Sequence, residues 1–195
     1  MLQTLRRTRL PAPKRFIPIN NQVRSFWEYV NMMFNKPDMD RVKQFGPDRT
    51  CAEWVLRNGG KIVWEDGSRL TDYNSLPPEG FPIKRVREID GSDSSISHYG
   101  FSHISGCTML HKIILHNNNY IENKALQGLA YGQSTLGHVQ VSKCCNVTDA
   151  GIKELIQLPK LETVVLFDLT SVSNLKDCKL YLQQHLPNCK ILDKE

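Results

Sequence analysis

Residues 136–147, LGHVQVSKCCNV, place apolar side chains at their first, fourth, sixth and twelfth positions and a cysteine, Cys144, at the ninth. Segments that begin at Leu110 and Leu161 repeat this pattern, with an asparagine or a leucine at the ninth position. A shorter version begins at Val86, so the segment starts are 24, 26 and 25 residues apart. Self-similarity at this period is typical of repeat proteins, in which each unit buries its apolar residues against its neighbours.

Each of these units combines a strand-sized apolar segment with a polar turn, and the second and third units continue into a helical apolar pattern. This order predicts an α/β fold, a short leucine-rich-repeat solenoid of about four cysteine-type repeats with parallel strands and helices. The ninth position of such a unit points inward, so Cys144 is predicted to be buried and structural. Cys145 falls in the polar turn and is the candidate redox residue, because it is the more exposed of the two thiols.

Residues 25–82 precede the repeats and contain all three tryptophans of the chain. We expect one helix over SFWEYVNMMFN, capped by Ser25. A second helix is expected over GPDRTCAEWVLRNGG, with Pro47 in its first turn and Gly59 as its terminator. The segment KIVWEDGSRL then predicts a β-hairpin that turns at Asp66–Gly67. These elements predict a small N-terminal α/β block that caps the repeats.

The first 24 residues differ in charge from the rest of the chain. They hold six arginines and lysines and no acidic residue, whereas residues 25–195 carry a net charge of −1. An arginine-rich, acid-free start predicts a disordered mitochondrial transit peptide, 1–24, and a basic tail is the alternative. A cluster of prolines divides the remainder into an aromatic-rich capping domain, 25–82, and a leucine-rich-repeat domain, 83–195. The near-neutral body argues against nucleic acid, and no apolar run has the length of a membrane helix.

Motifs for catalysis or nucleotide binding are missing from the sequence. There is no glycine-rich phosphate-binding motif, and the six histidines form no metal-binding motif. The six cysteines show no CxxC spacing, which argues against a zinc site. No candidate nucleophile is accompanied by a base, so we predict that the protein is not an enzyme.

The tryptophan-bearing N-terminal segment and the repeats together resemble the mitochondrial ATP synthase subunit s family, also called coupling factor B. That family is related to distal membrane-arm assembly proteins of respiratory complex I. The motifs that carry the resemblance are, in order, FWEYVNMMFNKPDMDRV, GPDRTCAEWVLRNGG, DYNSLP, EIDGSDSSI, YIEN and CNVTDAGI. The resemblance implies a protein on the matrix side of the mitochondrial inner membrane, peripheral to it, whose partners are membrane-sector subunits of ATP synthase. It implies a coupling factor that supports proton conduction and coupled ATP synthesis by blocking a proton leak.

The resemblance also implies a magnesium ion, Mg²⁺, held partly through main-chain oxygens, and the matching positions here are Gly59 and Ser92. One departure from the family pattern affects the expected chemistry. Family members carry a closely spaced cysteine pair just before YIE, whereas this chain has His116, Asn117 and Asn118 there. A dithiol mechanism at that position is therefore excluded by composition.

A docking role predicts that the strands offer side chains to a partner protein. The candidate protein-binding residues are His138, Gln140, Ser142, Thr163 and Val165. Assembly of the membrane arm of respiratory complex I is the second hypothesis, because the same fold and location would serve it. An F-box-type substrate receptor is the third, but it needs three consecutive helices, whereas the capping domain is predicted to contain a hairpin. The sequence leaves open whether the chain forms a homo-oligomer.

Overall fold

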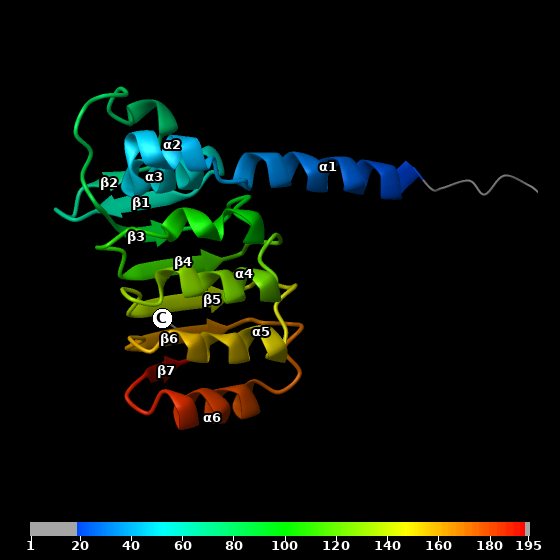
Figure 1. The fold of residues 1–195 in the computed structure, drawn as a ribbon. Coiled ribbons are helices and arrows are strands. Elements are labelled where there is room, and N and C mark those ends of the chain that lie inside the picture. Colours follow the sequence, from blue (N-terminus) through cyan, green and yellow to red (C-terminus); the bar gives the residue numbers. More distant parts are fainter. Residues whose placement is uncertain (1–18, 194–195) are drawn as a thin grey trace, which may run out of the picture.

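The computed structural model describes residues 19–193. Its centre is one mixed sheet of seven strands in the order β2-β1-β3-β4-β5-β6-β7, and the strands from β3 to β7 are all parallel (Figure 1). The strands are β1 (Lys61–Trp64), β2 (Arg69–Leu70), β3 (Val86–Asp90), β4 (Lys112–His116), β5 (His138–Ser142), β6 (Thr163–Phe167) and β7 (Lys190–Leu192). The architecture is therefore α/β, with a mostly parallel sheet that alternates with helices.

The helical segments that follow the parallel strands return along one face of the sheet (Figure 1). The α-helices are α1 (Ile19–Asn35), α2 (Met39–Phe45), α3 (Pro47–Arg57), α4 (Asn123–Gly128), α5 (Asp149–Lys153) and α6 (Leu175–His185). The 3₁₀ helices are η1 (Tyr73–Ser75), η2 (His98–Ile104), η3 (Leu129–Gly132) and η4 (Glu154–Gln157). Helices α1, α2 and α3 form an N-terminal helical region at one end of the sheet (Figure 1).

The strand register confirms the periodicity of the sequence. Ile113 pairs with Val139, Val139 with Val164, and Val164 with Ile191 on neighbouring parallel strands. A residue in the left-handed backbone region follows four successive strands at the same spacing as the segment starts. These residues are Asp93, Asn117, Lys143 and Asp168. A recurrent left-handed turn at a fixed position shows that each unit leaves its strand in the same way.

Buried polar side chains at the ninth position of the units support these turns. Asn118 is fully buried and donates hydrogen bonds from Nδ2 to Ser94 Oγ at 3.1 Å and to the carbonyl of Ile96 at 3.1 Å. Cys144 is also fully buried, and its thiol donates to the carbonyls of Leu115 and Ser142. Burial raises the pKa of the Cys144 thiol. The prediction that Cys144 is structural is thus confirmed.

The N-terminal region and the parallel strands share one sheet. Strand β1 is antiparallel to β3, with Ile62 opposite Ile89, and it is also antiparallel to β2 across the predicted hairpin. Both isoleucines belong to the core that continues through the parallel strands. The predicted boundary before residue 83 therefore lies between two hydrogen-bonded strands of one sheet.

The helices of the N-terminal region correct two predictions. Helix α3 begins at Pro47 and is followed by Gly59 with a φ of 81°, as expected. Helix α1 begins at Ile19, so Ser25 lies inside it and the prediction that Ser25 caps it is wrong. No proline lies between residues 19 and 25, so nothing in the sequence interrupts the helix there. The additional helix α2 makes three consecutive helices before the hairpin, so the argument against an F-box-type receptor from helix number is also wrong.

Candidate functional site

Helix α1 is attached to the rest of the protein through its asparagines. Asn35 is fully buried, and its Oδ1 accepts hydrogen bonds from Trp54 Nε1 at 2.9 Å and from the amide of Ser97 at 2.9 Å. Its Nδ2 donates to the Asn31 carbonyl, to Asn58 Oδ1 and to the Ser95 carbonyl. Asn31 also donates to the Ser95 carbonyl, at 2.7 Å. The helix therefore packs through a polar face.

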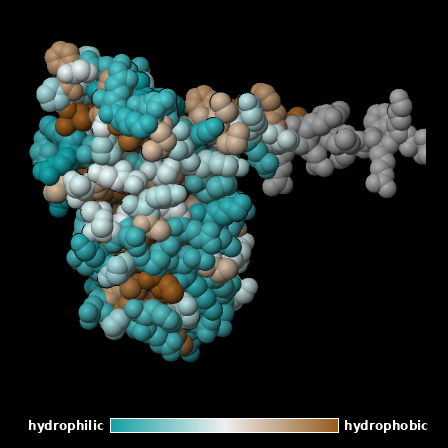
Figure 2. Space-filling model, viewed as in Figure 1, coloured by the Kyte–Doolittle hydropathy of each residue, from teal (hydrophilic) through white to brown (hydrophobic). Residues whose placement is uncertain are grey.

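The apolar face of α1 is exposed as a consequence. Surface helices of globular proteins usually turn their apolar residues toward the core. Here five large apolar residues of α1 are each more than half exposed, and apolar side chains gather along the helix in the space-filling view (Figure 2). They are Phe26, Trp27, Tyr29, Met33 and Phe34. We call these five residues the aromatic face of α1. Exposed apolar surface of this extent is typical of an interaction site.

A hollow of about 260 Å³ lies between this face and the body of the protein. Trp27, Val30 and Phe34 line it from the helix, and Arg57 and Tyr120 line it from the body. Tyr120 is itself 42% exposed, so the apolar surface continues from α1 onto the turn after β4. The candidate site is thus the aromatic face of α1 together with an adjoining hollow, and the positively charged Arg57 side chain lines that hollow.

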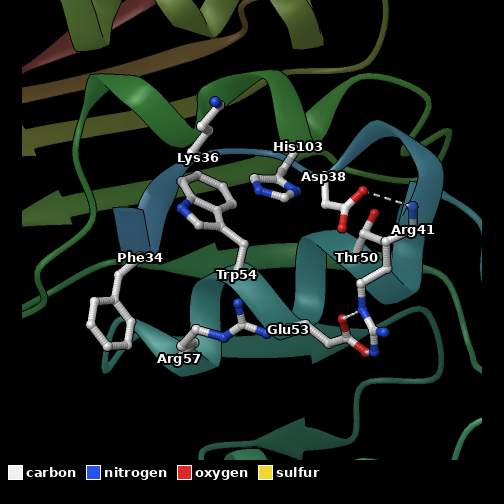
Figure 3. Close-up of a pocket in the computed structure, with 9 residues that line it drawn as sticks. All are labelled: Phe34, Lys36, Asp38, Arg41, Thr50, Glu53, Trp54, Arg57 and His103. Carbon is white, nitrogen blue, oxygen red and sulfur yellow. Dashed lines mark hydrogen bonds and ion pairs between the residues drawn. The ribbon is translucent and has the colours of Figure 1, made fainter. Parts of the chain in front are cut away.

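A second cavity lies beneath α1 and α2, where Trp54 and His103 stack with ring centroids 5.4 Å apart (Figure 3). Burial lowers the pKa of His103 to about 4, so the imidazole is neutral at physiological pH. Its Nδ1 is buried and has no hydrogen-bond partner among the described residues. The stacked pair joins α3 to η2 and supports the place where α1 is attached.

Acidic and basic side chains meet at the edge of this cavity. The Glu53 carboxylate, 3% exposed, accepts hydrogen bonds from Arg41 Nε at 2.7 Å and from Arg49 Nε at 3.1 Å. Burial alone would raise the pKa of Glu53, but the two guanidinium groups outweigh it and hold that pKa below its usual value. Arg49 also donates to the carbonyls of Pro77 and Pro78. This network connects α2, α3 and the loop before β3.

The five predicted protein-binding residues lie together on neighbouring strands. His138 pairs with Thr163 and Gln140 with Val165, and Ser142 lies at the end of the same strand as Gln140. Gln140 and Val165 are 3% exposed and Ser142 is 0% exposed, whereas His138 and Thr163 are half-buried. The aromatic face of α1 therefore offers far more accessible apolar surface than this group does. The sequence analysis did not identify the aromatic face of α1 as a site, although the spacing of its aromatic residues can be read from the sequence.

The remaining predicted site residues are placed as follows. Cys145 is exposed, and its thiol contacts Asn119 Oδ1 at 3.5 Å, so its redox role stays a prediction. Gly59 lies shortly before β1 and Ser92 shortly after β3, beyond the Lys61–Asp90 pair that ends the β1–β3 ladder. Magnesium binding at these two positions stays a prediction.

A metal-binding cluster and a membrane-spanning helix are both absent from residues 19–193. No three histidine, cysteine or acidic side chains converge there in a way that could hold a metal ion. Within the same range, none of the helices combines the length and the apolar character needed to cross a bilayer.

Together, the fold and the site define a mixed α/β protein in which the largest group of exposed apolar side chains among residues 19–193 lies on α1. No protein-family model matches the chain. The rat protein "ATP synthase subunit s, mitochondrial" is 34% identical over 179 residues, which cover 90% of each chain. The mouse protein of the same name is 36% identical over 172 residues, covering 86% of this chain and 84% of the mouse protein. The chain therefore belongs to the mitochondrial ATP synthase subunit s family.

A more distant relative is the fruit fly protein "Distal membrane arm assembly component 2". It is 21% identical over 159 residues, which cover 78% of this chain and 56% of the fly protein.

Proposed function

We propose that the protein is a non-enzymatic mitochondrial coupling factor that docks on membrane-sector subunits of ATP synthase. In this role it supports proton conduction and coupled ATP synthesis by blocking a proton leak. Membership of the subunit s family supports the choice of partner. The observation that carries a docking role is the exposed aromatic face of α1.

The composition of this face favours a protein partner. Aromatic residues, methionine and arginine are enriched at the centres of protein interfaces, and tryptophan, tyrosine and arginine supply most of the binding energy there. The face of α1 combines Trp27, Tyr29 and Met33, and Arg57 lies beside it at the hollow. The polar attachment of α1 leaves these side chains exposed, so that a partner can cover them.

The repeated units are interpreted as a leucine-rich-repeat solenoid of about four cysteine-type repeats, closed at one end by the N-terminal region. The recurrent left-handed turns and the buried ninth positions support this interpretation. We place the protein at the matrix side of the inner membrane, reached by a transit peptide within residues 1–24. Residues 1–18 of this predicted peptide lie outside the described residues, whereas residues 19–24, which were predicted to be disordered, belong to α1. The acid-free start of the sequence and the mitochondrial relatives support the placement.

Replacing Trp27 and Phe34 together with serine is expected to reduce the recovery of ATP synthase membrane-sector subunits at least tenfold, because two aromatic side chains that a partner covers can contribute several kcal/mol to binding. Both residues are exposed, so the circular dichroism spectrum should not change. The measurement is affinity purification of the full chain, tagged at its C-terminus, from isolated mitochondria.

The matched control replaces Tyr131 and Leu180 with serine, because both are exposed apolar residues away from α1. Its recovery of ATP synthase should equal that of the wild type. Equal recovery with the Trp27 and Phe34 variant would contradict docking through α1, and absence of the protein from mitochondria would contradict the location. Recovery of complex I assembly intermediates instead would favour the second candidate function, which the similarity to the fly protein supports.

A magnesium ion at the end of the β1–β3 ladder is part of this proposal. The main-chain oxygens of Gly59 and Ser92 would hold it, and hard oxygen donors are the ligands that Mg²⁺ prefers. The Asp90 carboxylate also lies at this end, where it accepts a hydrogen bond from the Ser92 amide at 3.0 Å. We expect Mg²⁺ to raise the melting temperature of the protein and Asp90→Asn to reduce that rise. A melting temperature that does not respond to Mg²⁺ would remove the ion from the proposal.

A further inference from the structure

Asn58 is the only asparagine of the sequence that is followed by glycine. It caps the C-terminal end of α3, and Gly59 after it has a φ of 81°. An asparagine side chain is attacked most readily by the main-chain amide of a following glycine, because glycine has no Cβ to block the approach. Asparagine is among the thermally labile residues of proteins. The sequence therefore places a chemically labile pair between α3 and β1.

Four hydrogen bonds hold the side chain of Asn58 in place. Its Oδ1 accepts from Asn35 Nδ2 at 3.1 Å and from Ser95 Oγ at 3.3 Å. Its Nδ2 donates to the carbonyl of Trp54 at 2.9 Å and to that of Phe34 at 3.3 Å. Asn58 is 3% exposed, so all four bonds lie in the interior of the protein.

Two of these four bonds come from α1, because Asn35 and Phe34 both lie on that helix. The group that would attack the side chain is also occupied, since the Gly59 amide donates to the Leu56 carbonyl at 3.0 Å. The attachment of α1 therefore helps to fix the side-chain carbon of Asn58 that the Gly59 nitrogen would have to reach.

We propose that Asn58 is a deamidation site that the attachment of α1 protects, and that its deamidation prevents α1 from attaching again. In the first step the Gly59 nitrogen loses its proton and attacks Asn58 Cγ, the Cγ–Nδ2 bond breaks, ammonia leaves and a five-membered succinimide forms. In the second step water opens the ring at one of its two carbonyls, which leaves aspartate or isoaspartate at position 58. One water is consumed and one ammonia is released, with no oxidation or reduction.

The product cannot restore the contacts that hold α1. A carboxylate oxygen replaces the Nδ2 group, which donates to the carbonyls of Phe34 and Trp54, so acceptors would face acceptors at a buried position. Burying a carboxylate among carbonyl oxygens is strongly unfavourable. Isoaspartate also lengthens the main chain by one carbon, which displaces the Asn58 carbonyl from the Ser95 amide that donates to it. Detachment of α1 then becomes permanent.

The first test measures deamidation of the full chain at mildly alkaline pH, by peptide mapping of the mass gained when NH₂ becomes OH. In urea Asn58 should deamidate faster than the other asparagines, and in buffer it should remain almost unchanged. Asn31→Ala removes a hydrogen bond from α1 to the Ser95 carbonyl and leaves the four bonds of Asn58 in place. In buffer this variant should deamidate at Asn58 at least tenfold faster than the wild type, because the site opens more often.

The matched control is Asn123→Ala. Asn123 exchanges hydrogen bonds with Thr148, so this variant removes asparagine hydrogen bonds between two repeated units rather than at α1. Its rate of deamidation at Asn58 in buffer should equal that of the wild type. This comparison separates local opening at α1 from a general loss of stability.

The second test examines the consequence of the modification. Asn58→Asp introduces the carboxylate of one product directly. Hydrogen exchange of the α1 amides should be faster in this variant than in the wild type, whereas the amides of β5 should keep their wild-type rates.

Three results would overturn the proposal. Asn58 could deamidate in urea no faster than the other asparagines, or in buffer as fast as in urea. Asn31→Ala could leave the rate at Asn58 unchanged or raise it no more than Asn123→Ala does, which would show that the attachment of α1 does not protect the site. The α1 amides of Asn58→Asp could exchange at the wild-type rate, which would show that the product still holds the helix.

Discussion

Replacing Glu53 with alanine is expected to lower the free energy of unfolding by about 3–5 kcal/mol, because removing one partner leaves a buried charge without compensation. The Arg49 side chain is 6% exposed, and its Nε–H would lose its carboxylate acceptor. Arg41 would lose its contact at 2.7 Å and keep Glu79, whose side chain is 55% exposed, as its carboxylate partner. Urea denaturation of the variant and the wild type measures the difference.

The matched control for Glu53→Ala is Asp177→Ala. Asp177 forms a single ion pair with Lys153 at 3.1 Å, and its side chain is 58% exposed. Its loss should cost no more than about 1 kcal/mol. A loss for Glu53→Ala as small as that of the control would show that the network does not stabilise the fold.

The effect of Glu53→Ala should also depend on pH. The pKa of Glu53 is lower in the folded protein than its usual value of 4.5. A carboxylate with a lowered pKa stabilises the fold above its unfolded value, and this contribution is lost as the pH falls through the folded value. The difference between the variant and the wild type should therefore shrink on acidification below about pH 4.5.

Replacing Asn35 with aspartate is expected to cost about 3 kcal/mol or more, although the two side chains have nearly the same shape. The retained oxygen can still accept from Trp54 and Ser97. The other oxygen, however, replaces an NH₂ group that donates to three oxygens, so it would meet three acceptors at a fully buried position. Urea denaturation measures this loss.

Asn188→Asp is the control for Asn35→Asp, because Asn188 is an exposed residue in the turn before β7. It should change the free energy of unfolding by no more than about 0.5 kcal/mol. If Asn35→Asp is as mild as this control, the hydrogen bonds of Asn35 do not determine how α1 is attached. Hydrogen exchange of the α1 amides should report the same loss as faster exchange in the variant.

The parallel sheet could be predicted from the sequence because its signal repeats. Leu110, Leu136 and Leu161 begin segments with the same apolar positions, and the register of Ile113, Val139 and Val164 follows from that spacing. A single short apolar segment could belong to a strand or to a helix, but the same pattern repeated at a fixed spacing identifies a repeat protein.

The direction of α1 could not be predicted in this way. The spacing of Phe26, Val30 and Met33 correctly indicated a helix with an apolar face, but in the structure Phe26 and Met33 are more than half exposed instead of packing into the core. What decides the orientation is the contact of Asn35 with residues 58–97, and such long-range hydrogen bonds leave no local pattern. Two asparagines four residues apart, Asn31 and Asn35, were the available signal.

Helix α2 and the burial of the strand residues were missed for different reasons. Helix α2 has only seven residues, and its main local signal is the N-cap Asp38, which accepts hydrogen bonds from the amides of Asp40 and Arg41. Ser142 is buried because His116 Nδ1 lies 2.7 Å from its hydroxyl and Gln140 donates to the same oxygen. Contacts between side chains of neighbouring strands depend on the assembled sheet, so alternation along one strand does not reveal them.

The attachment of α1 has a mechanical consequence. Hydrogen bonds require a narrow range of distances and angles, whereas hydrophobic contacts have no preferred direction. The hydrogen bonds of the Asn35 amide should therefore fix the orientation of α1 relative to the residues that it contacts. Force applied to its outer side would reach Ser95 and Ser97 directly, and through them the loop that follows β3.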